Sequence, residues 1–136
     1  MSASDRRFEL TILPNGIALV RLSADAELPR WATVGSFFSV TRTSDELSIA
    51  CDARQVPSGV DAQTGWRVLK VEGPFASTEI GVLSALSGTL AEAKVSLVAI
   101  STFDTDYLLV SEKQLAAAIA ALRSAGHRVQ ENAAAS

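Results

Sequence analysis

The sequence predicts an α+β fold built from two ferredoxin-like units in tandem, the first of them reduced. Three observations point to it. Short strand-like segments fill the first half, the second half follows the order β-α-β-β-α-β, and residues 57–65 between them carry no long apolar pattern. The β-α-β-β-α-β order is that of a split unit with two helices on one face of an antiparallel sheet. We therefore expect units at 7–60 and 65–131, followed by a flexible tail at 132–136.

The N-terminal unit is expected to contain strands, with helices shrunk to about one turn. Asn15-Gly16 readily adopts the positive φ values of a hairpin turn, so the strands on either side of it should pair with each other. Pro29 stands early in a short helical turn, a position that suits proline. In chain order, the expected elements are strands at 8–13 and 17–22, a helical turn at 28–32, and strands at 37–42 and 47–51.

The C-terminal unit shows clear helical periodicity. One apolar stripe at a 3.6-residue period predicts its first helix over about residues 78–93. Ser77 or Thr78 can cap the start of this helix, and Glu79 suits the positive end of the helix dipole. Gly88 in the helix interior suggests a close packing contact. The stripe consists of Ile80, Leu83, Leu86 and Leu90.

Local signals also mark the other elements of this unit. Residues 73–75 (Gly-Pro-Phe) end its first strand and could shape a pocket before the helix. Residues 111–114 (Ser-Glu-Lys-Gln) have the spacing of a capping box and predict the start of a second helix. Gly126 stands where a left-handed residue ends that helix. The expected strands lie at 66–71, 95–101, 107–110 and 127–130, and the second helix places Leu115, Ala118, Ile119 and Leu122 on one face.

Composition excludes several classes of function. The chain has 136 residues, a net charge of −3 and 48% apolar residues, which suits a packed core and not the basic face of a nucleic-acid binder. No run approaches the ~18 apolar residues of a membrane span, and the first residues lack an apolar signal segment. Cys51 and His127 are single residues of their types, which excludes an internal disulfide and a histidine-rich metal site. We expect a cytoplasmic protein that needs no cofactor or metal and binds neither nucleic acid nor membrane.

Residues 99–110, AISTFDTDYLLV, resemble a segment of ACT domains, which are small amino-acid-sensing modules. The resemblance is closest to the cytosolic arginine sensors and their stand-alone bacterial relatives, and the regulatory domains of aspartate kinase have a related Ile-Ser-Thr strand end. Residues 36–43 are similar to a Phe-Phe-Ser strand of the arginine-sensor group, and residues 81–93 to the helix after the first ACT strand. The resemblance covers about residues 8–129.

This resemblance implies a regulatory binding module and not a catalyst. In such proteins an amino acid lies where two ACT units meet, against the start of the first helix and the end of the second strand. Two copies of this chain would form such an interface, so a homodimer is expected. Asp106 matches an acidic position that faces arginine in one half of the arginine sensors. Carried onto this sequence, the ligand-binding residues are Thr78, Glu79, Ile80, Gly81, Val82, Leu83, Ser101, Thr102, Phe103, Asp104 and Asp106.

The same residues have a physical interpretation and a simpler alternative. Backbone N–H groups at a helix start can bind an α-carboxylate, and Asp104 and Asp106 can bind an ammonium or a guanidinium. Equally, Asp and Thr are common in turns because they bond to their own backbone. Glu79 is more typical of a surface residue that complements the helix dipole, and it would repel a carboxylate.

Three functions stay open at this point. The first is a stand-alone regulator that binds an amino acid, and the second is an interaction module without a ligand. The third, a small enzyme, has the least support, because only Glu79, Asp104 and Asp106 cluster usefully. The remaining single residues are assigned to structure: Trp31 and Trp66 to a core or interface, Cys51 to packing, and His127 to a helix end or the surface.

Overall fold

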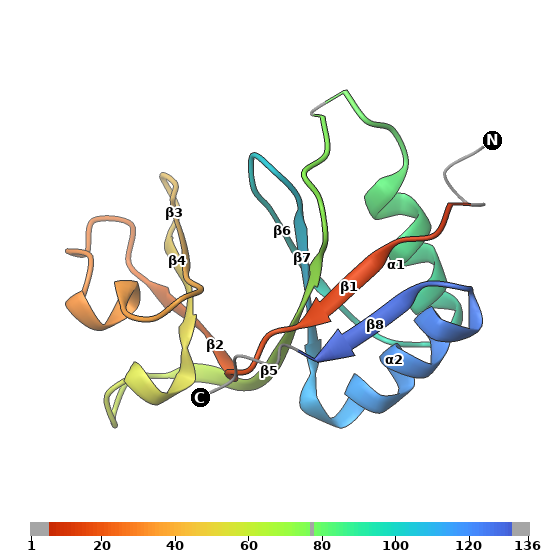
Figure 1. The fold of residues 1–136 in the computed structure, drawn as a ribbon. Coiled ribbons are helices and arrows are strands. Elements are labelled where there is room, and N and C mark those ends of the chain that lie inside the picture. The colour runs from red at the N-terminus through yellow and green to blue at the C-terminus, as the bar shows by residue number, and fades with distance from the viewer. Residues whose placement is uncertain (1–5, 77, 132–136) are drawn as a thin grey trace. The chain divides into compact units, whose positions relative to one another are not determined.

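The computed structural model describes residues 6–76 and 78–131 of this chain, and these form an α+β fold (Figure 1). Strands alternate with two α-helices and with short 3₁₀ turns at Arg30–Thr33, Ala53–Gln55 and Glu112–Gln114. In chain order, the strands and α-helices are β1 (Glu9–Ile12), β2 (Ile17–Leu22), β3 (Ser39–Arg42), β4 (Leu47–Asp52), β5 (Ala62–Val71), α1 (Val82–Glu92), β6 (Val98–Ser101), β7 (Asp106–Ser111), α2 (Leu115–Ser124) and β8 (Arg128–Glu131).

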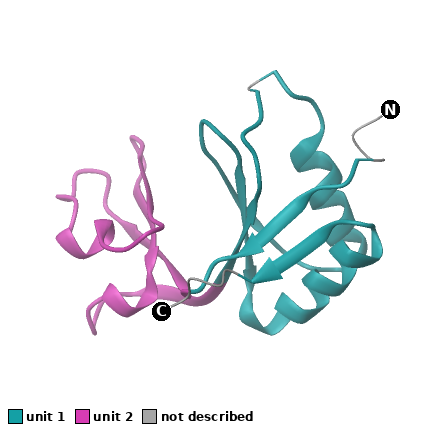
Figure 2. Ribbon diagram, viewed as in Figure 1, with its two compact units in different colours: residues 1–14, 67–136 teal, residues 15–66 magenta. Residues whose placement is uncertain are grey.

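The contacts divide the chain into two compact units (Figure 2). One, called here the helical unit, comprises the described parts of residues 1–14 and 67–136. The other, called here the strand unit, comprises residues 15–66. Residues 7–14, which the sequence assigns to the N-terminal unit, therefore belong with the C-terminal one.

The helical unit contains the predicted β-α-β-β-α-β order, from β5 through α1, β6, β7 and α2 to β8. Its strands lie in the order β6-β7-β5-β1-β8, so β1 is inserted between the first and last strands of the predicted pattern. Both helices lie on the same side of these strands (Figure 1). Buried residues of the two helices and the sheet form one core, which includes Leu10, Leu69, Leu86, Leu90, Leu108 and Leu122.

The predicted hairpin between β1 and β2 is wrong. Leu10 of β1 pairs with Val71 of β5 on one side and with Val129 of β8 on the other. β2 also pairs antiparallel with β5, so the chain keeps its direction across Pro14-Asn15-Gly16. A place between two strands satisfies the backbone N–H and C=O groups on both edges of β1, which a two-stranded hairpin leaves open.

The first helix begins later than predicted. α1 starts at Val82 because Gly81 has a φ of 82°, and a right-handed helix does not pass through a left-handed residue. Thr78 and Ile80 lie in the preceding loop, and Ile80 is 85% exposed instead of buried. The proposed cap at Ser77 lies outside the described residues. The expected packing contact at Gly88 is also wrong, since a Cβ placed there would meet no atom within 4 Å.

The predicted capping box before α2 is not formed. Ser111 precedes a 3₁₀ turn and makes no capping bond with its side chain. Gln114 instead accepts a hydrogen bond from the Ser96 N–H and donates one to the Lys94 carbonyl, both at 3.2 Å. The predicted left-handed residue after α2 is confirmed, because Gly126 has a φ of 96°.

The strand unit contains β2, β3, β4 and the first part of β5, and residues 15–66 include no α-helix. The strands on either side of residues 43–46, β3 and β4, pair antiparallel with each other. β5 begins at Ala62, inside the segment expected to be a connection. Cys51 is buried in a small core with Val20, Ala32, Leu47 and Ile49, as its packing role predicts. No helix in the described part of the chain is long and apolar enough to cross a membrane.

Candidate functional site

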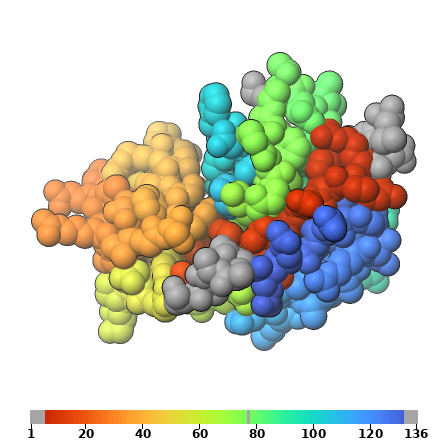
Figure 3. Space-filling model, viewed as in Figure 1, coloured from red at the N-terminus to blue at the C-terminus, as the bar shows by residue number. Residues whose placement is uncertain are grey.

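A cavity of about 430 Å³ opens in the helical unit where the start of α1 meets the loop between β6 and β7. We call it the helix–loop cavity. On the molecular surface, the β6–β7 segment lies beside the segment that follows β5 (Figure 3), and the Phe75 N–H donates a hydrogen bond of 2.8 Å to the Asp104 carbonyl. The volume lies within the ~300–1,000 Å³ range of small-molecule sites. The cavity is lined by Phe75, Ala76, Glu79, Gly81, Val82, Leu83, Ser84, Ser101, Thr102, Phe103, Asp104, Thr105 and Asp106.

The structure brings together most of the residues that the sequence singled out. Every predicted site residue except Thr78 and Ile80 lines this cavity. Sequence reasoning missed Ala76, Ser84 and Thr105, although Thr105 lies inside the motif that carried the prediction. Phe75 belongs to the Gly-Pro-Phe break, for which we had left a pocket role open.

The loop that forms the acidic end of the cavity is built by its own side chains. The Thr102 N–H donates to the Thr105 carbonyl at 2.8 Å, and the Thr105 N–H donates to the Thr102 hydroxyl at 3.3 Å. The buried Thr105 hydroxyl donates to the carbonyl of Val71 at 2.6 Å, which ties the loop to the end of β5. These bonds fix the backbone that carries Asp104 and Asp106.

Three carboxylates face the cavity, and the described residues of its lining include no Lys, Arg or His. The Ser101 hydroxyl donates to Asp106 at 2.5 Å, and Glu79 forms an ion pair with Arg6 at 2.5 Å. Asp104 contributes its backbone carbonyl to the bond from Phe75, and its side chain is exposed at the mouth of the cavity. The acidic end therefore suits a cationic group.

The opposite end is the first turn of α1. Gly81 caps the helix without a side chain, and its carbonyl accepts the Ala85 N–H at 2.9 Å. The N–H groups of Val82, Leu83 and Ser84 precede the first intrahelical bond, so they have no partner within the helix. All three residues line the cavity, where the positive end of the helix dipole favours a carboxylate.

His127 follows the end of α2, where its N–H donates to the Leu122 carbonyl, so the helix-end alternative is confirmed, whereas the surface alternative is wrong because the residue is buried. Its Nδ1 accepts a hydrogen bond of 3.0 Å from the Phe8 N–H, and its ring stacks on Phe8 with centroids 5.5 Å apart. Burial lowers the pKa of the imidazole, and the charge of Arg7 lowers it further. His127 is only 7% exposed because Phe8, the residue before β1, covers it.

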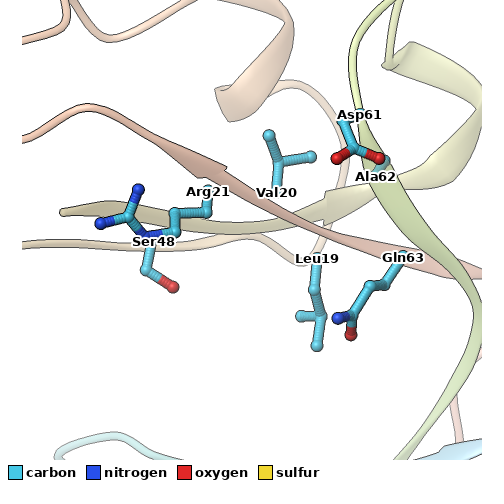
Figure 4. Close-up of a pocket in the computed structure, with 7 residues that line it drawn as sticks. All are labelled: Leu19, Val20, Arg21, Ser48, Asp61, Ala62 and Gln63. Carbon is cyan, nitrogen blue, oxygen red and sulfur yellow. The ribbon is translucent and has the colours of Figure 1, made fainter.

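A second cavity, of about 200 Å³, belongs to the strand unit (Figure 4), and we call it the strand cavity. It lies where the β2–β5 ladder ends at the Val20–Ala62 pair. Figure 4 shows the guanidinium of Arg21 extended away from the carboxylate of Asp61. Arg21 donates a hydrogen bond of 2.8 Å to the Asp45 carbonyl. The polar groups of this cavity do not converge on one point, so it is the weaker candidate. Within residues 6–76 and 78–131, no group of three or more His, Cys, Asp or Glu could hold a metal ion.

A β-α-β-β-α-β unit with both helices on one face of its sheet (Figure 1) defines a ferredoxin-like α+β module. Residues 61–124 match the sequence pattern of the ACT domain, so this part of the chain is similar to that family. A second family pattern, described as an N-terminal domain, matches residues 16–59. Neither match includes β1, which precedes both matched ranges in the chain and belongs to the helical unit.

The chain is also similar in sequence to known proteins. The chain is 32% identical over 96 residues to the human "Cytosolic arginine sensor for mTORC1 subunit 1", an alignment that covers 65% of this chain and 29% of that protein. The chain therefore spans under a third of the length of this relative. The bovine protein of the same name is 31% identical over the same length. These matches confirm the predicted resemblance to the arginine sensors.

Two solved structures agree with the fold. Protein Atu0741 from Agobacterium tumefaciens is 38% identical, with a TM-score of 0.87, and the match covers 93% of this chain and 95% of that one. The regulatory subunit of aspartate kinase from Thermus thermophilus is 9% identical, with a TM-score of 0.55 and coverage of 82% and 91%. The second likeness shows the fold alone, and together they confirm the predicted ferredoxin-like, ACT-type architecture.

Proposed function

We propose that this chain is a cytosolic regulatory module that binds a small amino acid-like ligand in the helix–loop cavity. One observation carries the proposal: the cavity has the N–H groups of the first turn of α1 at one end and the carboxylates of Asp104 and Asp106 at the other. An amino acid has the complementary pair of charges. The match to the ACT domain pattern and the similarity to the arginine sensor support the same class of ligand.

The charges of the cavity favour a basic amino acid. The α-carboxylate would lie against the N–H groups of Val82, Leu83 and Ser84. The cationic end would lie against Asp104 and Asp106, where a guanidinium could bond in a bidentate way. In this arrangement the Ser101 hydroxyl orients Asp106 through their 2.5 Å hydrogen bond.

Self-association would complete the site. Phe103 lines the cavity and is 96% exposed, and Ile80, next to Gly81, is 85% exposed. Large apolar side chains at the rim of a polar site favour contact with another surface. We propose that a second copy of the chain covers this rim in a homodimer, and that the ligand favours one arrangement of the two copies over another.

The main alternative is an interaction module that pairs with partners and binds no ligand. The exposure of Ile80 and Phe103 supports this alternative equally well. An enzyme is a weaker hypothesis, because the lining, as far as the structure describes it, offers hydroxyls and carboxylates but no histidine or cysteine to activate a nucleophile. Ligand binding separates the proposal from both alternatives.

Thermal unfolding in the presence of each standard amino acid at millimolar concentration tests the proposal. A ligand that binds only the folded state stabilises it, by about 2.7 kcal/mol at a concentration of ~100 Kd. We expect a basic amino acid to raise the melting temperature. Failure of every amino acid to shift it would contradict the proposal and favour the interaction module.

Asp106→Ala should abolish the shift caused by a basic ligand, because it removes a carboxylate from the cavity and leaves the Ser101 hydroxyl without its partner. The matched control is Asp61→Ala, which removes a carboxylate from the strand cavity. The control should keep the full shift. Equal losses in both variants would place the ligand elsewhere.

A further inference from the structure

We infer that Arg6 is a positioning residue that lets the helix–loop cavity accept a carboxylate, and so selects an amino acid over the corresponding amine. The inference rests on the proposed ligand site. It concerns a residue outside the cavity lining, on the segment before β1, which acts through Glu79.

Glu79 creates an electrostatic difficulty for the proposed ligand. It lines the cavity close to the start of α1, where the ligand carboxylate would lie. An uncompensated carboxylate there would repel the ligand and compete for the same N–H groups. Asp104 and Asp106 also face the cavity, so all charged side chains among the described lining residues would then be negative. Such a cavity would bind a ligand with only a positive charge more tightly than a zwitterion.

Arg6 removes that difficulty by pairing with Glu79. Its guanidinium lies 2.5 Å from a carboxylate oxygen of Glu79. The two side chains are 32% and 30% exposed, so solvent screens this pair less than it screens a fully exposed one. The pair neutralises the helix end of the cavity and leaves the negative charge at Asp104 and Asp106.

The guanidinium of Arg6 is held in place by two aromatic rings, one from Phe8 on its own segment and one from Phe75 after β5. Its central carbon lies 4.9 Å from the ring centroid of Phe8 and 6.0 Å from that of Phe75. These two rings pack edge to face with centroids 6.0 Å apart. Phe8 is fixed in turn by the hydrogen bond from its N–H to His127. Arg6 is therefore positioned before any ligand arrives, which reduces the entropy lost on binding.

The test uses isothermal titration calorimetry with L-arginine and with agmatine, which carries the same guanidinium and chain but no carboxylate. In Arg6→Met, we expect the affinity for L-arginine to fall about tenfold, while that for agmatine is kept or rises. Arg6→Met/Glu79→Gln should recover L-arginine binding, because the repelling charge has gone. A role of Arg6 in packing alone would weaken both ligands together and would not be rescued by Glu79→Gln.

Arg128→Met is the matched control. Arg128 pairs with Glu9 at 3.0 Å in the same unit, and the two side chains are 82% and 52% exposed. Because so exposed an ion pair contributes little, the substitution should leave the affinities for both ligands unchanged. Parallel losses of both ligands in Arg6→Met, or no rescue by the double variant, would overturn the role of Arg6. Wild-type protein that binds agmatine and not L-arginine would overturn this inference alone. Wild-type protein that binds neither would overturn the inference, and it would overturn the proposed function as well if no other amino acid raises the melting temperature.

Discussion

The helical unit and the strand unit each bury one face of a sheet, but they cover it differently. Two α-helices pack on the strands of the helical unit, whereas in the strand unit the small core is completed by partly buried residues such as Trp31 of the 3₁₀ turn. The difference extends to their cavities. The helix–loop cavity has a volume of about 430 Å³ and lies between the start of a helix and a hairpin loop. The strand cavity has a volume of about 200 Å³ and lies at the end of a strand ladder.

The comparison shows which elements of a small fold can supply groups that bind a ligand. A helix end supplies backbone donors with a common direction, and a hairpin loop supplies carboxylates on a backbone fixed by its own hydrogen bonds. In the strand unit, the charged side chains of Arg21 and Asp61 point apart (Figure 4). We therefore place binding in the helical unit and treat the strand unit as the reference for each prediction.

The largest expected effects come from the two cores. Leu86→Ala in α1 and Leu47→Ala in β4 each remove a buried side chain, and each should lower the free energy of unfolding by about 2–5 kcal/mol. Only Leu86→Ala should also weaken ligand binding, because Leu86 packs the helix whose first turn lines the cavity. Urea unfolding and calorimetry measure the two effects. Equal losses of affinity in both variants would remove the distinction between the units.

An intermediate effect is expected at two left-handed glycines. Gly126 in the helical unit has a φ of 96° and Gly65 in the strand unit has a φ of 83°. Alanine at either position should cost about 1–2 kcal/mol, because L-residues are strained in this conformation. Gly126→Ala should cost more, since its Cβ would collide with the side chain of Arg7, whereas no atom lies within 4 Å of a Cβ at Gly65. Chemical denaturation of both variants checks the order, and a larger loss in Gly65→Ala would contradict it.

The smallest expected effect is a pH dependence that belongs to the helical unit. The His127 pKa lies below 6.5 in the folded protein because of burial and the charge of Arg7, so the unfolded chain binds a proton first as the pH falls. The free energy of unfolding should therefore decrease as the pH drops from about 6.5 through the folded pKa of His127. Protonation of Nδ1 would also remove the acceptor for the Phe8 N–H.

His127→Gln should flatten this slope between about pH 5 and pH 8, because glutamine does not titrate there. Asp52→Asn in the strand unit is the control. A hydrogen bond from Arg54 lowers the pKa of Asp52 below 3.8 even though burial opposes it, so its contribution is lost only at more acidic pH. Unfolding curves at several pH values provide the measurement. A slope that persists in His127→Gln would assign it to another group.

The parts of the site that the sequence predicted are those built from local contacts. Ser101 bonds to Asp106, and Thr102 bonds to Thr105, so the motif itself fixes the shape of the loop. The parts it missed depend on residues distant in sequence. Phe8 and His127 are 119 positions apart in the sequence. Arg6 precedes residues 15–66 of the strand unit in the sequence, and its partner Glu79 follows them. Periodicity and turn signals carry no information about such pairs.

The fold shows the same division. The order of elements from β5 to β8 follows from helical and strand periodicity, which are local. The place of β1 does not, because its apolar residues would suit a hairpin or a central strand equally, and only hydrogen bonds to β5 and β8 decide between them. The start of α1 was missed because the left-handed conformation of Gly81 is not visible in a pattern of apolar residues.

The central claim is that an amino acid-like ligand binds the helical unit at the start of α1 and the β6–β7 loop. Two-dimensional NMR of the labelled protein, titrated with the amino acid that gives the largest thermal shift, tests it most directly. The account predicts changes at the amides of residues 81–84 and 101–106, and unchanged signals at Arg21, Ser48 and Gln63 of the strand cavity. Changes confined to the strand cavity, or none with any amino acid, would contradict it.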